Sequence, residues 1–80
     1  DICGFNGNTT EELCARWMAL GAFYPFMRNH NTYDTISQEP FAFGATSPVL
    51  ASSKRCLSVR YSLLPHLYNL FFQSYQTGLP

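Results

Sequence analysis

Charged residues are scarce in this chain of 80 residues, since Asp, Glu, Lys and Arg together make up only 12% of it. The five basic and five acidic residues cancel, and the basic ones are scattered, so no basic patch is available for a phosphate backbone. A long apolar run is lacking as well. The most apolar stretch, residues 63–72, is too short to span a bilayer and is interrupted by Pro65 and His66. We therefore expect no nucleic-acid partner and no membrane segment in this chain.

Motifs typical of cofactor sites and of common catalytic sites are also absent. The sequence contains no Gly-rich loop for a phosphate, no His/Cys spacing for a metal ion and no nucleophile elbow around a Ser. The acids beyond Asp1 have no spacing that marks a pair of carboxylates flanking a glycosidic bond. These acids are Glu11, Glu12, Asp34 and Glu39. We expect neither a metal nor an organic cofactor.

Apolar side chains, by contrast, are abundant: 46% of the residues are hydrophobic, with seven Phe and five Tyr. A domain of this length buries only about 60% of the surface of its unfolded chain, so many of these aromatic rings would stay exposed if it stood alone. The sequence also begins at Asp1 without an initiator Met and stops at Leu79-Pro80. We expect residues 1–80 to be a fragment of a larger domain, not an autonomous one.

Cysteine usage indicates the compartment. Cys3 and Cys14 flank a turn-rich segment, and they are either a disulfide that closes a short loop or two buried thiols. Asn8-Thr9-Thr10 is a candidate N-glycosylation site, with Asn8 as the acceptor, in the same segment. Together these features favour a protein of the secretory pathway. Cys56 is left over and is expected to be a free, buried thiol on a helix.

The first half of the chain predicts a strand end, a helix and a strand. Residues 1–5 resemble the end of a strand that runs into a turn. Thr9 at the N-cap and Glu12 three residues later predict a helix start, and Gly21 predicts its end. Residues 23–27 are apolar and aromatic, and they predict a strand even though Pro25 cannot donate to a ladder.

The second half predicts a long loop followed by a helix. Residues 29–46 are polar and too many for a tight connection, so a functional loop is expected there. Ser47-Pro48 is typical of the N-cap and first residue of a helix. Pro65 predicts a kink or a break in this helix, and Gly78 predicts its end.

The order of these elements favours an α/β fold with parallel strands. In a (β/α) barrel, the residues that follow neighbouring strands meet on one face, which is the face that carries active sites. Asp1 and the Arg28-Asn29-His30 group would then lie together there. A carboxylate, a guanidinium and an imidazole can exchange hydrogen bonds with vicinal hydroxyls on both the donor and the acceptor side, as sugar recognition requires.

Each of these side chains also has an ordinary structural explanation. Asp1 can be an N-cap or loop carboxylate, and Arg28 can be the partner that keeps a carboxylate ionised. His30 can be a histidine with satisfied hydrogen bonds in the core or in a loop. Phe5 can belong to the core or form an apolar wall against a sugar ring. The residues alone leave these alternatives open.

Several long motifs, in order, resemble glycoside hydrolases of family thirty-one. They are DICGF at residues 1–5, NTTEELC at 8–14, RWM at 16–18, LGAFYPFMRNHN at 20–31, QEP at 38–40 and RYSLLPHLY at 60–68. The resemblance implies a retaining α-glucosidase on a (β/α)₈ barrel. This chain would supply the end of strand seven, helix seven, strand eight and helix eight of that catalytic domain. The Asp nucleophile and the Asp acid/base would both lie upstream, so no catalytic residue is expected in this segment.

The resemblance also implies a role for each candidate residue. His30 would bind sugar hydroxyls, Asp1 and Arg28 would form a charged floor, and Phe5 would line the sugar ring. Cys3 matches a disulfide to Cys14 that is typical of the maltase, sucrase-isomaltase and acid α-glucosidase branch. The expected substrate is an α-glucoside oligosaccharide of the maltose type, cleaved at its terminal non-reducing glucose. The alternatives are a non-catalytic carbohydrate-binding module and a small disulfide-stapled interaction module.

Overall fold

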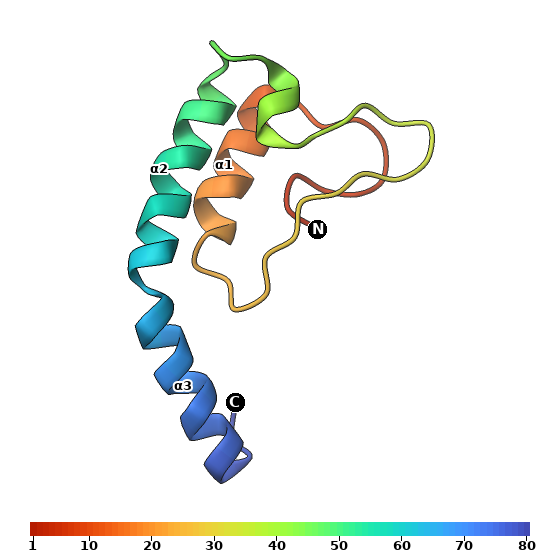
Figure 1. The fold of residues 1–80 in the computed structure, drawn as a ribbon. Coiled ribbons are helices and arrows are strands. Elements are labelled where there is room, and N and C mark those ends of the chain that lie inside the picture. Colours follow the sequence, from red (N-terminus) through yellow and green to blue (C-terminus); the bar gives the residue numbers. More distant parts are fainter.

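The computed structural model describes residues 1–80 as helices joined by irregular segments (Figure 1). The elements are helix α1 (Glu11–Gly21), the 3₁₀ helix η1 (Pro40–Phe43), helix α2 (Pro48–Ser62) and helix α3 (Leu64–Thr77). Helices α1 and α2 pack side by side, and η1 lies against one end of this pair (Figure 1). Helix α3 continues beyond the other end, away from the rest of the chain (Figure 1).

Helix α1 begins one residue later than the sequence predicts. Its N-cap is Thr10, whose backbone is extended and whose hydroxyl accepts a hydrogen bond from Leu13 N at 3.2 Å. The prediction of Thr9 as the N-cap is therefore wrong, because the side chain of Thr9 is buried and makes no capping bond. The helix ends at Gly21, as predicted.

The start of α2 and the end of α3 agree with the sequence prediction, and the helix breaks between them, close to Pro65. Ser47 caps α2, and its hydroxyl accepts from Val49 N at 3.1 Å, with Pro48 as the first helical residue. The predicted break occurs at Leu63, and Pro65 then lies in the first turn of α3, where its missing N–H has no helical partner to lose. Gly78 ends α3 in a left-handed conformation (φ 72°).

The predicted strand at residues 23–27 is wrong, because this segment forms turns and bends. Pro25 has no N–H, and the guanidinium of Arg60 on α2 binds backbone carbonyl oxygens of this segment, so its polar groups do not form a ladder. The structure contains no strand, and its one β interaction is an isolated parallel bridge between Ile2 and Asn29. Of the predicted α/β arrangement, the structure therefore contains the helices and, in place of parallel strands, this single bridge.

The core is small and lies between the N-terminal segment and helices α1 and α2. Its fully buried apolar side chains are Ile2, Cys3, Cys14, Met18 and Val49. Cys3 and Cys14 form a disulfide, and it fastens the segment of the bridge to α1. This confirms that Cys3 and Cys14 are paired.

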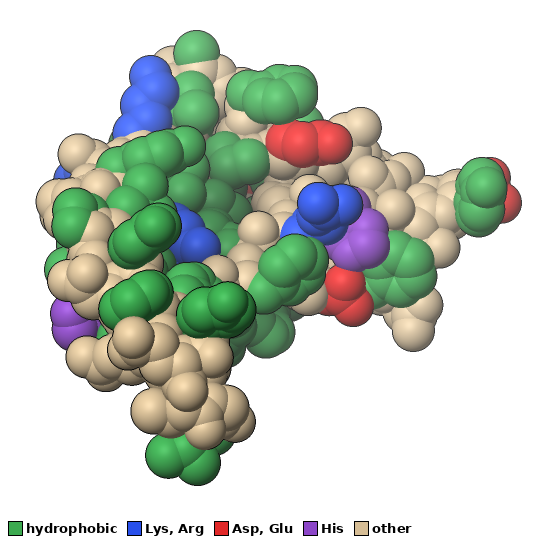
Figure 2. All heavy atoms as spheres, turned by 60° about the horizontal axis from the view of Figure 1, so that its bottom comes forward, with side chains coloured by type: hydrophobic (Ala, Val, Ile, Leu, Met, Phe, Trp, Pro, Cys, Tyr) green, Lys and Arg blue, Asp and Glu red, His purple; other side chains and the backbone are tan.

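Two parts of the helices stay outside this core. Cys56 is a free cysteine on α2, as predicted, but it is only half-buried. Helix α3 has no buried residue, and it exposes several large apolar side chains. These include Tyr68, Leu70, Phe71, Phe72 and Tyr75. Figure 2 shows many hydrophobic side chains gathered on one side of the molecule.

Candidate functional site

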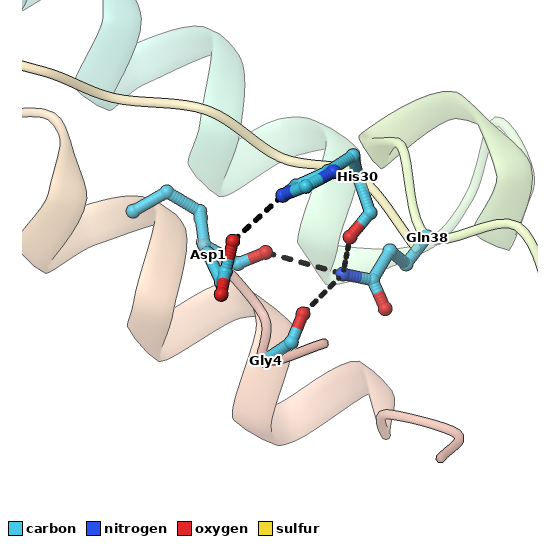
Figure 3. Close-up of polar contacts among 5 residues, drawn as sticks. Asp1, Gly4, His30 and Gln38 are labelled. Atoms are coloured by element: carbon cyan, nitrogen blue, oxygen red, sulfur yellow. Dashed lines mark hydrogen bonds and ion pairs between the residues drawn. The ribbon is translucent and has the colours of Figure 1, made fainter. Parts of the chain in front are cut away.

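The parallel bridge brings together two segments that are far apart in the sequence. Ile2 pairs with Asn29, and Ile2 N donates to the carbonyl oxygen of Arg28 at 2.8 Å. Asp1 and His30 flank the paired residues, and Nε2 of His30 lies 2.6 Å from Oδ1 of Asp1 (Figure 3). The side chain of Asp1 is 57% exposed and that of His30 is 44% exposed, so a ligand can reach both of them. The predicted neighbours Asp1 and His30 are thus in direct contact.

Phe5 completes one side of this pair. Its ring centroid lies 5.0 Å from that of the His30 imidazole, with the two planes tilted by 41°. An open hollow lies beside these two rings, and it is lined by Phe5, His30, Asn31, Thr32 and Tyr33. The arrangement offers a hydrogen-bonding pair and an aromatic ring to the same space.

Arg28 lies apart from the pair in this structure. Its guanidinium carbon is 5.8 Å from the centroid of the Phe26 ring, and its side chain is exposed. The ion pairs of the chain are Arg16 with Glu12 and His30 with Asp1, so Arg28 makes none. The charged floor of Asp1 and Arg28 stays a prediction.

Sequence reasoning missed the side chain that connects the two segments. Nε2 of Gln38 donates to the carbonyl oxygens of Ile2, Gly4 and His30, at 3.2, 2.8 and 2.7 Å (Figure 3). The sequence carries little signal for this role, since a Gln in a polar loop usually faces water. Only its place in the QEP motif set it apart.

Asn8, the candidate glycosylation site, is exposed and directly follows the bends at residues 5–7. Its side-chain oxygen accepts from Ile36 N at 2.9 Å, which ties this segment to the long loop. The glycan at Asn8 stays a prediction.

We also examined the chain for a metal site and for a membrane-spanning helix. No group of three or more His, Cys, Asp and Glu side chains is placed to hold a metal ion. None of the helices combines the length and the apolar character that crossing a bilayer requires. What the site provides is one carboxylate, one imidazole and one aromatic ring, a set suited to binding a polar molecule with an apolar face.

Comparison with known proteins identifies the family to which this chain belongs. Residues 1–70 match the family model described as "Glycosyl hydrolases family 31 TIM-barrel domain". The chain therefore belongs to glycosyl hydrolase family 31, in agreement with the motifs in its sequence.

Individual relatives agree with the family. The chain is 60% identical to lysosomal acid alpha-glucosidase of Tetrahymena pyriformis over 78 residues, which cover 98% of this chain and 8% of that protein. It is 55% identical to probable maltase-glucoamylase 2 of Homo sapiens, again over 98% of this chain but only 3% of the relative. Lysosomal alpha-glucosidase of Rattus norvegicus is 54% identical over 98% of this chain and 8% of its own length. The chain thus spans less than a tenth of each of these proteins.

Proposed function

We propose that this chain is one segment of a longer retaining α-glucosidase, called the parent enzyme below, and that the segment binds the glucose unit at the cleaved bond. The parent enzyme would remove terminal non-reducing α-linked glucose from maltose-type oligosaccharides. The observation that carries the proposal is the contact of 2.6 Å between His30 Nε2 and Asp1 Oδ1 beside the ring of Phe5.

The chemistry of these three side chains suits a sugar. A carboxylate accepts hydrogen bonds from hydroxyl groups, and an imidazole that pairs with it keeps a second nitrogen to exchange another. The aromatic ring of Phe5 supports the apolar C–H face of a pyranose. Arg28 would supply a further cation at the edge of the pocket once the remainder of the barrel surrounds it.

The division of labour within the parent enzyme follows from the same proposal. The segment would form the end of strand seven, helix seven, strand eight and helix eight of the barrel. The nucleophile and the acid/base would come from other strands, so this segment holds the sugar and does not cut it. The exposed apolar side chains of α3 would pack against the remainder of the barrel, and isolated residues 1–80 would be inactive.

Two further features fit this assignment. The relatives named lysosomal support a secretory-pathway enzyme, and the disulfide of Cys3 and Cys14 suits an oxidising compartment. A small disulfide-stapled module is the alternative, but only 11 of the 80 residues are buried, which gives a module of its own little core.

The test is the kinetics of the parent enzyme with His30→Ala. Removing a hydrogen bond that strengthens in the transition state should cost about 2–4 kcal/mol of transition-state stabilisation. This loss corresponds to a kcat/KM for maltose that is roughly 30- to 900-fold lower. The matched control is His66→Ala, because His66 is an exposed histidine on α3 outside the site. Circular dichroism of each variant checks that it is folded.

The control variant should retain the kcat/KM of the unmodified enzyme. Equal kcat/KM values for His30→Ala and His66→Ala would remove His30 from the sugar site and contradict the proposal.

A further inference from the structure

Gln38 is a polar side chain at the centre of the candidate site, and it is only 1% exposed. It lies in the irregular segment just before η1, so no helix or strand determines its position. Burying an amide costs free energy unless its hydrogen bonds are made. The hydrogen-bond partners of Gln38 therefore explain why its side chain is buried at this position.

The amide nitrogen of Gln38 joins both segments of the site. It donates to Ile2 O at 3.2 Å and Gly4 O at 2.8 Å on one side, and to His30 O at 2.7 Å on the other (Figure 3). Two N–H groups therefore serve three carbonyl oxygens, and one N–H is shared. The three acceptors also fix the orientation of the amide, because its oxygen in the same place would face three other oxygens.

The backbone of Gln38 makes a further hydrogen bond to the site. Nδ2 of Asn29 donates to the carbonyl oxygen of Gln38 at 2.8 Å. Asn29 is also the residue that pairs with Ile2 in the parallel bridge, and it directly precedes His30. Gln38 is thus bound to both segments through its side chain, and to the segment of His30 a second time through its backbone.

We propose that Gln38 is a positioning residue that sets the distance between the segment of Asp1 and Phe5 and the segment of His30. An isolated bridge gives these segments little pairing of their own, so the amide supplies the spacing that a longer ladder would provide. Gln38 touches neither the imidazole nor the carboxylate and acts through the backbone that carries them. This inference rests on the proposed sugar-binding function.

The first test replaces Gln38 with Glu in the parent enzyme. A neutral Glu can donate one O–H to a carbonyl, whereas an ionised one faces three carbonyl oxygens without a proton, so the pKa of the new carboxyl should be raised. The ratio of kcat/KM for maltose between Gln38→Glu and the unmodified enzyme should therefore fall about tenfold from pH 5 to pH 7. Gln76→Glu is the matched control, since Gln76 is exposed on α3, and its ratio should stay flat.

The second test is Gln38→Met, which keeps the length of the side chain but removes the donor. Rates are expressed per folded enzyme, measured by circular dichroism at each pH. Loss of positioning should raise KM for maltose about tenfold, with a smaller change in kcat, because the reacting carboxylates come from elsewhere in the parent enzyme. A merely structural defect would lower the amount of folded enzyme and leave KM unchanged.

A flat pH ratio for Gln38→Glu, together with a KM for Gln38→Met within about twofold of the unmodified value, would overturn the positioning role. If His30→Ala is impaired in the same assays, the proposed function survives that result. If His30→Ala is not impaired, the proposed function itself has failed.

Discussion

Replacing Arg60 with Met should loosen the segment that connects α1 to the candidate site. The guanidinium of Arg60 donates to the carbonyl oxygens of Ala22 at 2.9 Å, Tyr24 at 2.5 Å and Pro25 at 3.2 Å. The oxygens of Tyr24 and Pro25 lie in the segment that the sequence predicts as a strand, and that of Ala22 directly precedes it. Arg60 therefore takes the place of the missing ladder and holds the segment against α2.

The expected magnitude follows from how well each contact is shielded. A hydrogen bond from a charged donor contributes about 1.5–3 kcal/mol, and less where water can replace it. The bond to Pro25 is exposed and contributes little, whereas the bonds to Ala22 and Tyr24 are partly buried. Met preserves most of the apolar stem. Local opening of the segment should therefore become easier by about 2–3 kcal/mol.

The assay is backbone hydrogen exchange in the parent enzyme, read at residues 22–27. A loss of about 2–3 kcal/mol in opening free energy should accelerate exchange there by roughly 30- to 150-fold. Arg55→Met is the matched control, since Arg55 is exposed on the same helix and makes no hydrogen bond or ion pair. Exchange at residues 22–27 that is equally fast in both variants would refute the role assigned to Arg60.

Two further changes act on the packing behind the site. Replacing both Cys3 and Cys14 with Ser should lower the free energy of unfolding of the parent enzyme by about 3 kcal/mol, since the bond closes a loop between residues 11 apart. Urea denaturation measures this, and an unchanged midpoint would contradict it. Gly21→Ala should destabilise by about 1–3 kcal/mol despite its better helix propensity, because the new Cβ would lie 2.2 Å from Cδ1 of Ile2. Adding Ile2→Val removes that atom and should restore part of the thermal midpoint; no recovery would exclude the clash.

The helices were predictable from the sequence because their signals are local. Ser47-Pro48, Pro65 and Gly78 act through the backbone of their own turn, and each marks the boundary that the structure has. Local signals also explain why the predicted start of α1 is wrong by one residue. Thr9 and Thr10 have the same capping chemistry, so the choice between them depends on backbone angles that the sequence does not specify.

The strand at residues 23–27 and the role of Gln38 were not predictable in this way. A parallel strand depends on hydrogen bonds to neighbouring strands, and here the one parallel pairing, of Ile2 with Asn29, lies outside residues 23–27. Gln38 depends on three carbonyl groups from two distant segments. No periodicity or spacing in the sequence predicts contacts between segments so far apart.

The contact of Asp1 with His30 was predictable because it needs only two assumptions. Both residues lie at the ends of strands that were expected to run in parallel, and parallel strands bring their ends to the same edge. Although the structure reduces the pairing to one bridge, that bridge lies beside both residues and brings them together. Arg28 shows the limit, because its side chain turns to Phe26.

The central claim is that this segment holds the glucose unit, and a crystal structure of the parent enzyme with glucose bound tests it most directly. The account predicts that sugar hydroxyls lie within hydrogen-bonding distance, about 2.7–3.2 Å, of His30 Nδ1, the ring nitrogen that Asp1 leaves free, and of the Asp1 carboxylate. The ring of Phe5 should line the same sugar. Glucose bound in the barrel without contact to His30 or Asp1 would contradict the account.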